Sequence, residues 1–500
     1  MRFVVSRFTF LFSSTRGLIL VAIASISLAT AFFGMLSGPM EEFGVKNWLV
    51  QNVGLSLLPQ EREGRIVILY HTLAMAVVAI ETYLITSLVA MKKSQQANIN
   101  ATITIGYLTS LVFGLWFAYF GHNFVFHGLF IAGQSLVFLA GLQLTAALWP
   151  WRKDVHIAGS QYSKTRGGVD LERVAFFLMA VATLGSAMFG AVAGSMFGNG
   201  FESFLAEDIV REPHKTPLEL AVIGHLHIML TLIAVALTLI LSRAYDFKGR
   251  LHKVAMPLMI IGTFIITMGV WAVVPFEAIA HIIINVGSLP VLAASLLLVY
   301  YGWQQNTARR LAEQQLSQPS LWQRLAALLH DPLRFGTLWQ MVYMNFVVTA
   351  VGIFMAIKLD KIIRTWPARE ERVALTGHWH VLAGIIATIL LLHYADISGL
   401  KGRLRQIFGW VVILFSDLAF GAVALLETKR LFVDELNQQP LVDTVILLAD
   451  IGLASVLTAL GILMVWRLID LFKARGRWKQ ELSEDRAAAV GSSLPEEVRS

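Results

Sequence analysis

The chain has 500 residues, of which 56% are hydrophobic, and these values exclude a soluble globular protein and fit only a polytopic membrane protein. It contains no cysteine, which excludes disulfides, thiolate-bound iron–sulfur clusters, a cysteine-ligated dinuclear copper centre and CxxCH-attached haem within this chain. Histidine is therefore the common soft metal ligand that remains, and we attribute the net charge of +7 to membrane topology and not to nucleic-acid binding.

Twelve apolar runs are each long enough to cross a bilayer, which takes about 20 helical residues. We therefore predict an all-α membrane protein with about twelve transmembrane helices. The first run follows a basic segment, as a cleaved signal peptide would, but its length favours a retained helix. The runs lie near Gly17–Leu36, Ile66–Met91, Ala101–Phe120, Val125–Trp149, Val174–Met196, Leu218–Leu241, Val254–Val274, Phe276–Trp303, Leu338–Ile357, Val373–His393, Ile407–Leu426 and Val442–Trp466.

The distribution of basic residues predicts the orientation of these helices. With both termini in the cytoplasm, most of the 40 lysines and arginines fall in inner segments, as the positive-inside rule requires. We expect residues 1–472 to form one transmembrane domain in an inner membrane of prokaryotic type. Residues 473–500 are expected to form a polar, mobile cytoplasmic tail. Three histidines, His156, His252 and His330, fall in inner loops, where we expect solvated structural roles.

A doubled motif indicates an internal repeat. Gly224–His225–Leu226–His227 opens one apolar run, and Gly377–His378–Trp379–His380 opens another. The motifs Lys248–Gly249–Arg250–Leu251 and Lys401–Gly402–Arg403–Leu404 follow at the same distance in both copies. A fainter third copy begins at His71, whose distance to Lys92 equals that from His227 to Lys248. We therefore predict three pseudo-repeats of four helices.

Six histidines are predicted near the outer ends of their helices, at comparable depth: His71, His225, His227, His281, His378 and His380. Histidine inside a membrane is costly and usually faces a partner or a cavity, which makes it a candidate functional residue. Two histidines that are two positions apart on a helix point about 200° apart, so each pair is expected to serve two sites on opposite helix faces. Without cysteine, facing imidazoles suit haem iron, copper or non-haem iron.

The helix count, the repeat and the order of these histidines resemble subunit I of the haem–copper oxidase superfamily, which includes cytochrome c and quinol oxidases and the nitric oxide reductase large subunit. The resemblance rests on His71 with Met75 four residues later, and on the His378–Trp379–His380 motif. It implies a low-spin haem between His71 and His380 and a high-spin haem on His378. It also implies a third metal, copper or non-haem iron, on His225 or His227 together with His281.

The chain departs from that family at the third metal. The adjacent histidine pair expected around His281 is missing, and neither tyrosine nor glutamate stands one turn after His225 or His227, where Met229 and Thr231 occur. We therefore do not expect four-electron oxygen reduction by the family's usual route, and the electron acceptor stays open. Glu277, one turn before His281, is either an oxygen ligand or a carboxylate at a helix start.

Two alternatives follow from the same residues. Because the His225/His227 motif copies the His378/His380 motif, one alternative is that helix six ligates haem iron in a copper-free, multi-haem electron-transfer subunit. Twelve spans with repeats also describe secondary transporters, although the copies here run in the same direction. In the oxidoreductase interpretation, electrons come from a second subunit, cytochrome c or quinol. Glu81, roughly 15 Å further into the membrane than His71, is then a candidate for catalytic proton transfer.

Overall fold

The computed structural model describes residues 2–36, 40, 43–58, 62–121, 123–195, 216–358, 361–434 and 437–491. In these ranges the chain is helical and contains no β-strand. Twelve helical segments are long and apolar enough to cross a membrane, and each coincides with one of the predicted runs. The predicted fold class is therefore confirmed: the chain is an all-α, multi-pass membrane protein.

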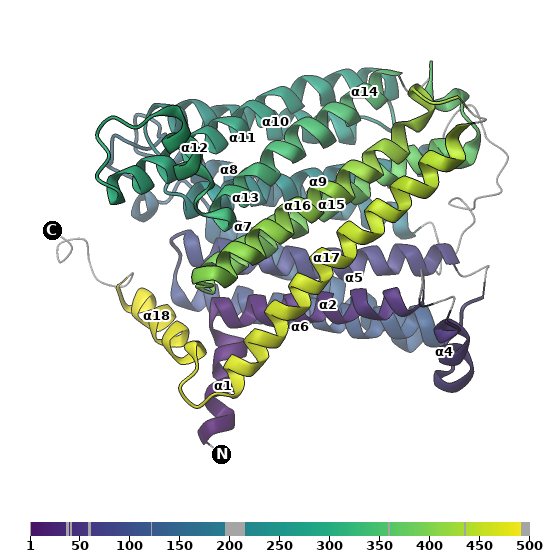
Figure 1. Ribbon diagram of the computed structural model, residues 1–500, viewed down its shortest axis with the longest axis horizontal. Helices are drawn as coiled ribbons and strands as arrows, with labels where there is room; N and C mark the ends of the chain where they lie inside the picture. The colour runs from purple at the N-terminus through teal and green to yellow at the C-terminus, as the bar shows by residue number, and fades with distance from the viewer. Residues whose placement is uncertain are drawn as a thin grey trace.

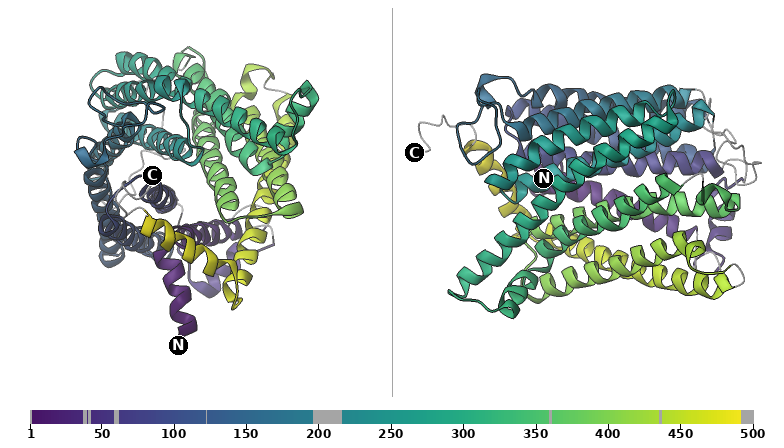
Figure 2. Two further views of the ribbon diagram at one scale, coloured as in Figure 1. Left: turned by 90° about the vertical axis from the view of Figure 1, so that its left-hand side faces the viewer. Right: turned by 90° about the horizontal axis from the view of Figure 1, so that it is seen from above.

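The spans form one helical bundle in which successive helices are roughly antiparallel (Figures 1 and 2). The twelve spanning segments consist of α2 (Thr15–Met35), α5 (Arg62–Leu88), α6 (Lys93–Phe120), α7 (Phe124–Leu148), α8 (Leu171–Ser195), α9 (Pro217–Ala244), α10 (Arg250–Trp271), α11 (Glu277–Glu313), α13 (Pro332–Tyr343) with α14 (Ala350–Lys358), α15 (Ala368–Ile397), α16 (Gly402–Thr428) and α17 (Gln438–Phe472). A π-helical turn, Met344–Thr349, joins α13 to α14 within the ninth span. Shorter helices are α1 (Arg2–Ser13), α4 (Val45–Val53), α12 (Leu321–Leu329) and α18 (Arg477–Gly491).

Local sequence explains where α9, the helix that carries His225 and His227, begins. Thr216 and Glu219 form a capping box, in which the Glu219 amide donates to the Thr216 hydroxyl at 3.2 Å and the Thr216 amide donates to the Glu219 carboxylate at 2.7 Å. Pro217 occupies the first turn, where its missing N–H costs nothing. The start of α9 is therefore fixed by its own sequence, and this fixes the height of the two histidines.

Small residues bring neighbouring helices into close contact. A Cβ atom on Gly133 of α7 would lie 2.5 Å from the backbone nitrogen of Ser110 on α6, so glycine is required there. Membrane helices gain most of their association energy from such close packing, because lipid tails are as apolar as the side chains.

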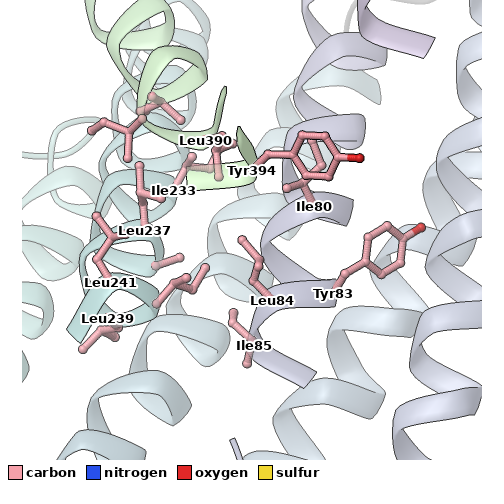
Figure 3. Close-up of a cluster of buried hydrophobic side chains, with 14 of the residues drawn as sticks. Ile80, Tyr83, Leu84, Ile85, Ile233, Leu237, Leu239, Leu241, Leu390 and Tyr394 are labelled. Atoms are coloured by element: carbon pink, nitrogen blue, oxygen red, sulfur yellow. The ribbon is translucent and has the colours of Figure 1, made fainter. Parts of the chain in front are cut away.

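The three helices that carry the histidine motifs pack together deeper in the bundle, where α9 contacts both α5 and α15. Figure 3 shows part of the buried hydrophobic cluster that they form. Its labelled members are Ile80, Tyr83, Leu84 and Ile85 of α5, Ile233, Leu237, Leu239 and Leu241 of α9, and Leu390 and Tyr394 of α15. This apolar contact holds the histidine-bearing ends of the three helices at fixed relative positions.

The C-terminal segment differs from its prediction as a mobile tail. Residues 477–491 form α18, which packs against α17 and α2 and buries Trp478 to 1% exposure. The Asp470 carboxylate accepts the Arg477 and Trp478 amides at 2.8 and 3.1 Å and so caps the new helix. The prediction of a mobile segment was wrong for residues 477–491 because a polar composition does not exclude a packed helix. Residues 492–500 of the predicted tail lie outside the described residues.

His252 also departs from its prediction as a solvated loop residue. It lies in the first turn of α10 and is fully buried. Its Nδ1 accepts the Ser163 amide at 2.9 Å, and its Nε2 lies 3.7 Å from the Glu172 carboxylate. Three segments far apart in sequence thus enclose a side chain that hydropathy alone had placed in solvent.

Candidate functional site

Three histidines at equivalent positions in the predicted repeat adopt the same side-chain arrangement. The Nδ1 atoms of His71, His227 and His380 each lie within hydrogen-bonding distance of the carbonyl four residues earlier, at 2.7, 2.8 and 2.7 Å. Because a carbonyl only accepts hydrogen bonds, each Nδ1 must carry the proton. This assignment leaves the lone pair of each imidazole on Nε2, the nitrogen that faces away from the helix backbone.

His225 uses a neighbouring helix for the same purpose. Its Nδ1 donates to the Ser186 carbonyl of α8 at 2.9 Å, and the Ser186 hydroxyl accepts the Trp271 indole N–H at 3.2 Å. Its ring lies 6.2 Å from that of His71, measured between ring centroids, and the two planes are within 12° of parallel. His225 therefore faces α8 and α5.

His227 points the other way, toward α15. Its Nε2 accepts the indole N–H of Trp379 at 3.0 Å, and the two rings are perpendicular. It lies close enough to His378 and to His281 of α11 to interact with both electrostatically. The two histidines of α9 thus serve opposite faces, as their 200° separation predicts, and they do not share one site.

The histidines of α15 are divided in the same way. His378 faces α14, where a Cβ atom on Gly352 would lie 2.8 Å from its Cε1 and Nε2 atoms. The Nε2 of His380 is hydrogen-bonded to the hydroxyl of Tyr70 on α5. Tyr70 stands directly before His71, and no sequence motif connects it with His380. The predicted pairing of His71 with His380 stays a prediction, because the described contact of His380 is with Tyr70 and that of His71 is with His225.

The two predicted catalytic carboxylates have different surroundings. Glu277 is the first residue of α11, and its Oε1 accepts the Arg364 guanidinium at 3.3 Å, which suits a carboxylate at a helix start. Glu81 is 4% exposed, and its Oε1 has no hydrogen-bond partner among the residues that the structure describes. A buried acid without a partner is costly in a membrane, so Glu81 is the stronger candidate for proton handling.

A second buried acid lies beside the α15 motif and was missed from the sequence. Glu427 of α16 is 4% exposed, and a Cβ atom on Gly377 would lie 2.5 Å from its Oε1. That oxygen has no hydrogen-bond partner in the described part of the chain. The predicted apolar run ended at Leu426, one residue earlier, so Glu427 had the sequence pattern of a solvated residue at a helix exit.

The donor set fits haem better than a bare ion. Within the described ranges, no three histidine, aspartate or glutamate side chains come together in a way that could hold one metal ion. The imidazoles instead occur singly or in facing pairs, which suits an iron whose other four ligands come from a porphyrin.

In comparisons with known proteins, no protein-family model matches the chain, and no curated protein is significantly similar to it.

Proposed function

We propose that this chain is a haem-containing membrane oxidoreductase that transfers electrons in a respiratory chain. The observation that supports it is the set of imidazoles on α5, α9 and α15 whose Nδ1 atoms are fixed by backbone carbonyls. Metal-ligating histidines characteristically donate their second nitrogen to a carbonyl or carboxylate, which sets the tautomer and the ring orientation. Haem, when bound, would supply one-electron chemistry and, where one axial position is open, binding of a small molecule such as oxygen or nitric oxide.

The residues between α9 and α15 would hold the haem at which a small molecule binds. His378 carries the iron in this proposal, His227 lies near His378, and His281 lies near His227. The Nε2 of His227 accepts the Trp379 indole N–H at 3.0 Å, so a metal on His227 would have to displace this hydrogen bond. The same proposal includes copper or non-haem iron on His227 and His281. It also includes an electron donor of the cytochrome c or quinol class and a second subunit.

Absorption spectroscopy tests the proposed function. Purified full-length protein should show a Soret band and reduced-minus-oxidised haem bands, and the reduced form should bind carbon monoxide at the His378 haem. A preparation without a Soret band, from cells supplied with haem precursors, would rule out the oxidoreductase and leave a secondary transporter as the better assignment.

Glu81→Gln is expected to slow turnover about 10- to 100-fold and to leave haem content unchanged. The substitution preserves the size of the buried side chain but removes the proton that it would carry, and positioned proton transfer typically contributes about 10²–10⁴-fold. Turnover with oxygen or nitric oxide as electron acceptor and haem content would be measured on the same samples. Thr86→Ser, five residues further along the same helix, is the control. Turnover equal to that of the unmodified protein would end the proton-transfer role of Glu81.

The proposed orientation places both termini in the cytoplasm and the histidines near the outer surface. Because the chain has no cysteine, each introduced cysteine is the only thiol. Leu321→Cys, 83% exposed on α12, is expected to react only from the cytoplasmic side, and Phe124→Cys, 86% exposed at the start of α7, only from outside. A membrane-impermeant maleimide applied to spheroplasts and to inverted vesicles measures this. The opposite labelling pattern would reverse the orientation.

A further inference from the structure

We propose that His71 of α5 and His225 of α9 are the two axial ligands of one haem, bound between these helices. This inference rests on the proposed function, because it assumes a chain that binds haem. It names a pairing that differs from His71 with His380, which the sequence resemblance implied. The two pairings predict different sets of variants that lose the same haem.

The separation of the two rings suits a shared iron. Their centroids are 6.2 Å apart, and their planes are nearly parallel, at 12°. An ion held by two imidazoles places the ring centres roughly 6 Å apart, because each metal–nitrogen bond is about 2 Å long. His71 and His225 already have the ring-centre spacing of two imidazoles that share one ion.

Both imidazoles are also held in the tautomer that a metal requires. The Nδ1 of His71 donates to the Val67 carbonyl at 2.7 Å, and that of His225 donates to the Ser186 carbonyl at 2.9 Å. Each Nε2 therefore carries a lone pair. Ser186 is fixed in turn by the Trp271 indole N–H, at 3.2 Å from its hydroxyl. Such outer contacts orient ligands and typically change metal affinity about 10- to 100-fold when removed.

The other repeat-equivalent histidines are engaged differently. The Nε2 of His227 accepts a hydrogen bond from Trp379, and the Nε2 of His380 is bonded to Tyr70. No tryptophan or tyrosine contact is described for the Nε2 of His71 or of His225. These two imidazoles face each other from different helices without such a cap, which distinguishes them from the pairing of His71 with His380.

The ring of His225 packs directly against the backbone of α8, at a position where only glycine leaves enough room. A Cβ atom on Gly190 of α8 would lie 2.3 Å from both Cε1 and Nδ1 of His225, well inside contact distance. Four residues later on the same helix, a Cβ atom on Gly194 would meet no atom of the described residues within 4 Å. Alanine at position 190 therefore displaces the proposed ligand, whereas alanine at position 194 adds the same methyl group without touching it.

The ligand class follows from the number of donors. Only two protein ligands face each other here, and the described residues provide no group of three that could hold an ion. A bare ion would lack most of its coordination sphere, whereas a porphyrin supplies four nitrogens in its own plane. The site therefore takes haem.

The experiment counts haems and records the ferric low-spin signal of the full-length protein by electron paramagnetic resonance. We expect His71→Ala and His225→Ala each to lose the same low-spin haem, one per chain, and His380→Ala to retain it. Loss of one shared signal in His71→Ala and His380→Ala, with retention in His225→Ala, would overturn the proposal while leaving the proposed function intact. Unmodified protein without haem would instead refute the proposed function itself.

Alanine substitutions at Gly190 and Gly194 test the same assignment without removing a histidine, which controls for variants that fail to fold. In Gly190→Ala we expect the low-spin signal to fall and a high-spin, carbon-monoxide-binding species to replace it, because one axial ligand is displaced. Gly194→Ala should keep the unmodified spectrum. A folded Gly190→Ala protein with an unchanged low-spin signal would contradict the assignment of His225.

Discussion

Replacing His378 with alanine is expected to abolish carbon monoxide binding by the reduced protein and to reduce turnover to background. In the proposed function this imidazole holds the haem that binds a small molecule. His380 is directed to Tyr70 on α5 and cannot substitute for it. A haem lost or left without its protein ligand no longer binds the small molecule in a defined geometry.

Haem content, carbon monoxide difference spectra and turnover would be measured together on His378→Ala. His330→Ala is the matched control, because His330 is exposed at the end of α12, away from the three motif-bearing helices. Full carbon monoxide binding in His378→Ala would show that this histidine does not hold the reactive haem. The same loss in His330→Ala would mean that the assay reports general damage.

Removing the carboxylate of Glu481 is expected to destabilise the protein by about 3–5 kcal/mol, the typical effect of breaking a buried ion pair by deleting one partner. Arg467 of α17 is 1% exposed and donates to both Glu481 oxygens, at 2.9 and 2.6 Å. In Glu481→Ala the guanidinium would stay buried, and the carboxylate left near it in the described part of the chain is the more distant Asp470, at 3.9 Å. The destabilisation should also release α18 from the bundle.

Thermal unfolding in detergent, followed by tryptophan fluorescence, measures this effect, and protease sensitivity of residues 477–491 reports the release of α18. The control is Glu484→Ala on the same helix. Its ion pair with Arg16 is partly exposed, at 23% and 47% for the two side chains, and such pairs contribute about 0–1 kcal/mol. Replacing both members of the buried pair, Arg467→Met with Glu481→Leu, should restore most of the stability. Equal unfolding temperatures for Glu481→Ala and Glu484→Ala would show that burial of the first pair has no special importance.

The predicted helix ends illustrate what hydropathy resolves and what it misses. The run Ile407–Leu426 matches the span that contains α16, yet its limit excluded Glu427, which the packing of Gly377 on α15 buries. The tail was predicted as mobile, yet Asp470 caps a helix that Arg467 anchors. In both cases a polar residue is buried by a partner that is distant in sequence, and composition within a window contains no information about that partner.

The amino-acid sequence alone determined the membrane class, the twelve spans and the opposite faces of His225 and His227. These properties depend on hydropathy, on the rise per residue and on the rotation per residue, all of which are local to one helix. Only the tertiary structure decided which imidazoles meet, because that depends on how α5, α9 and α15 are rotated against each other by their packing. His71 therefore faces His225, and His380 faces Tyr70, for a reason that no single helix contains.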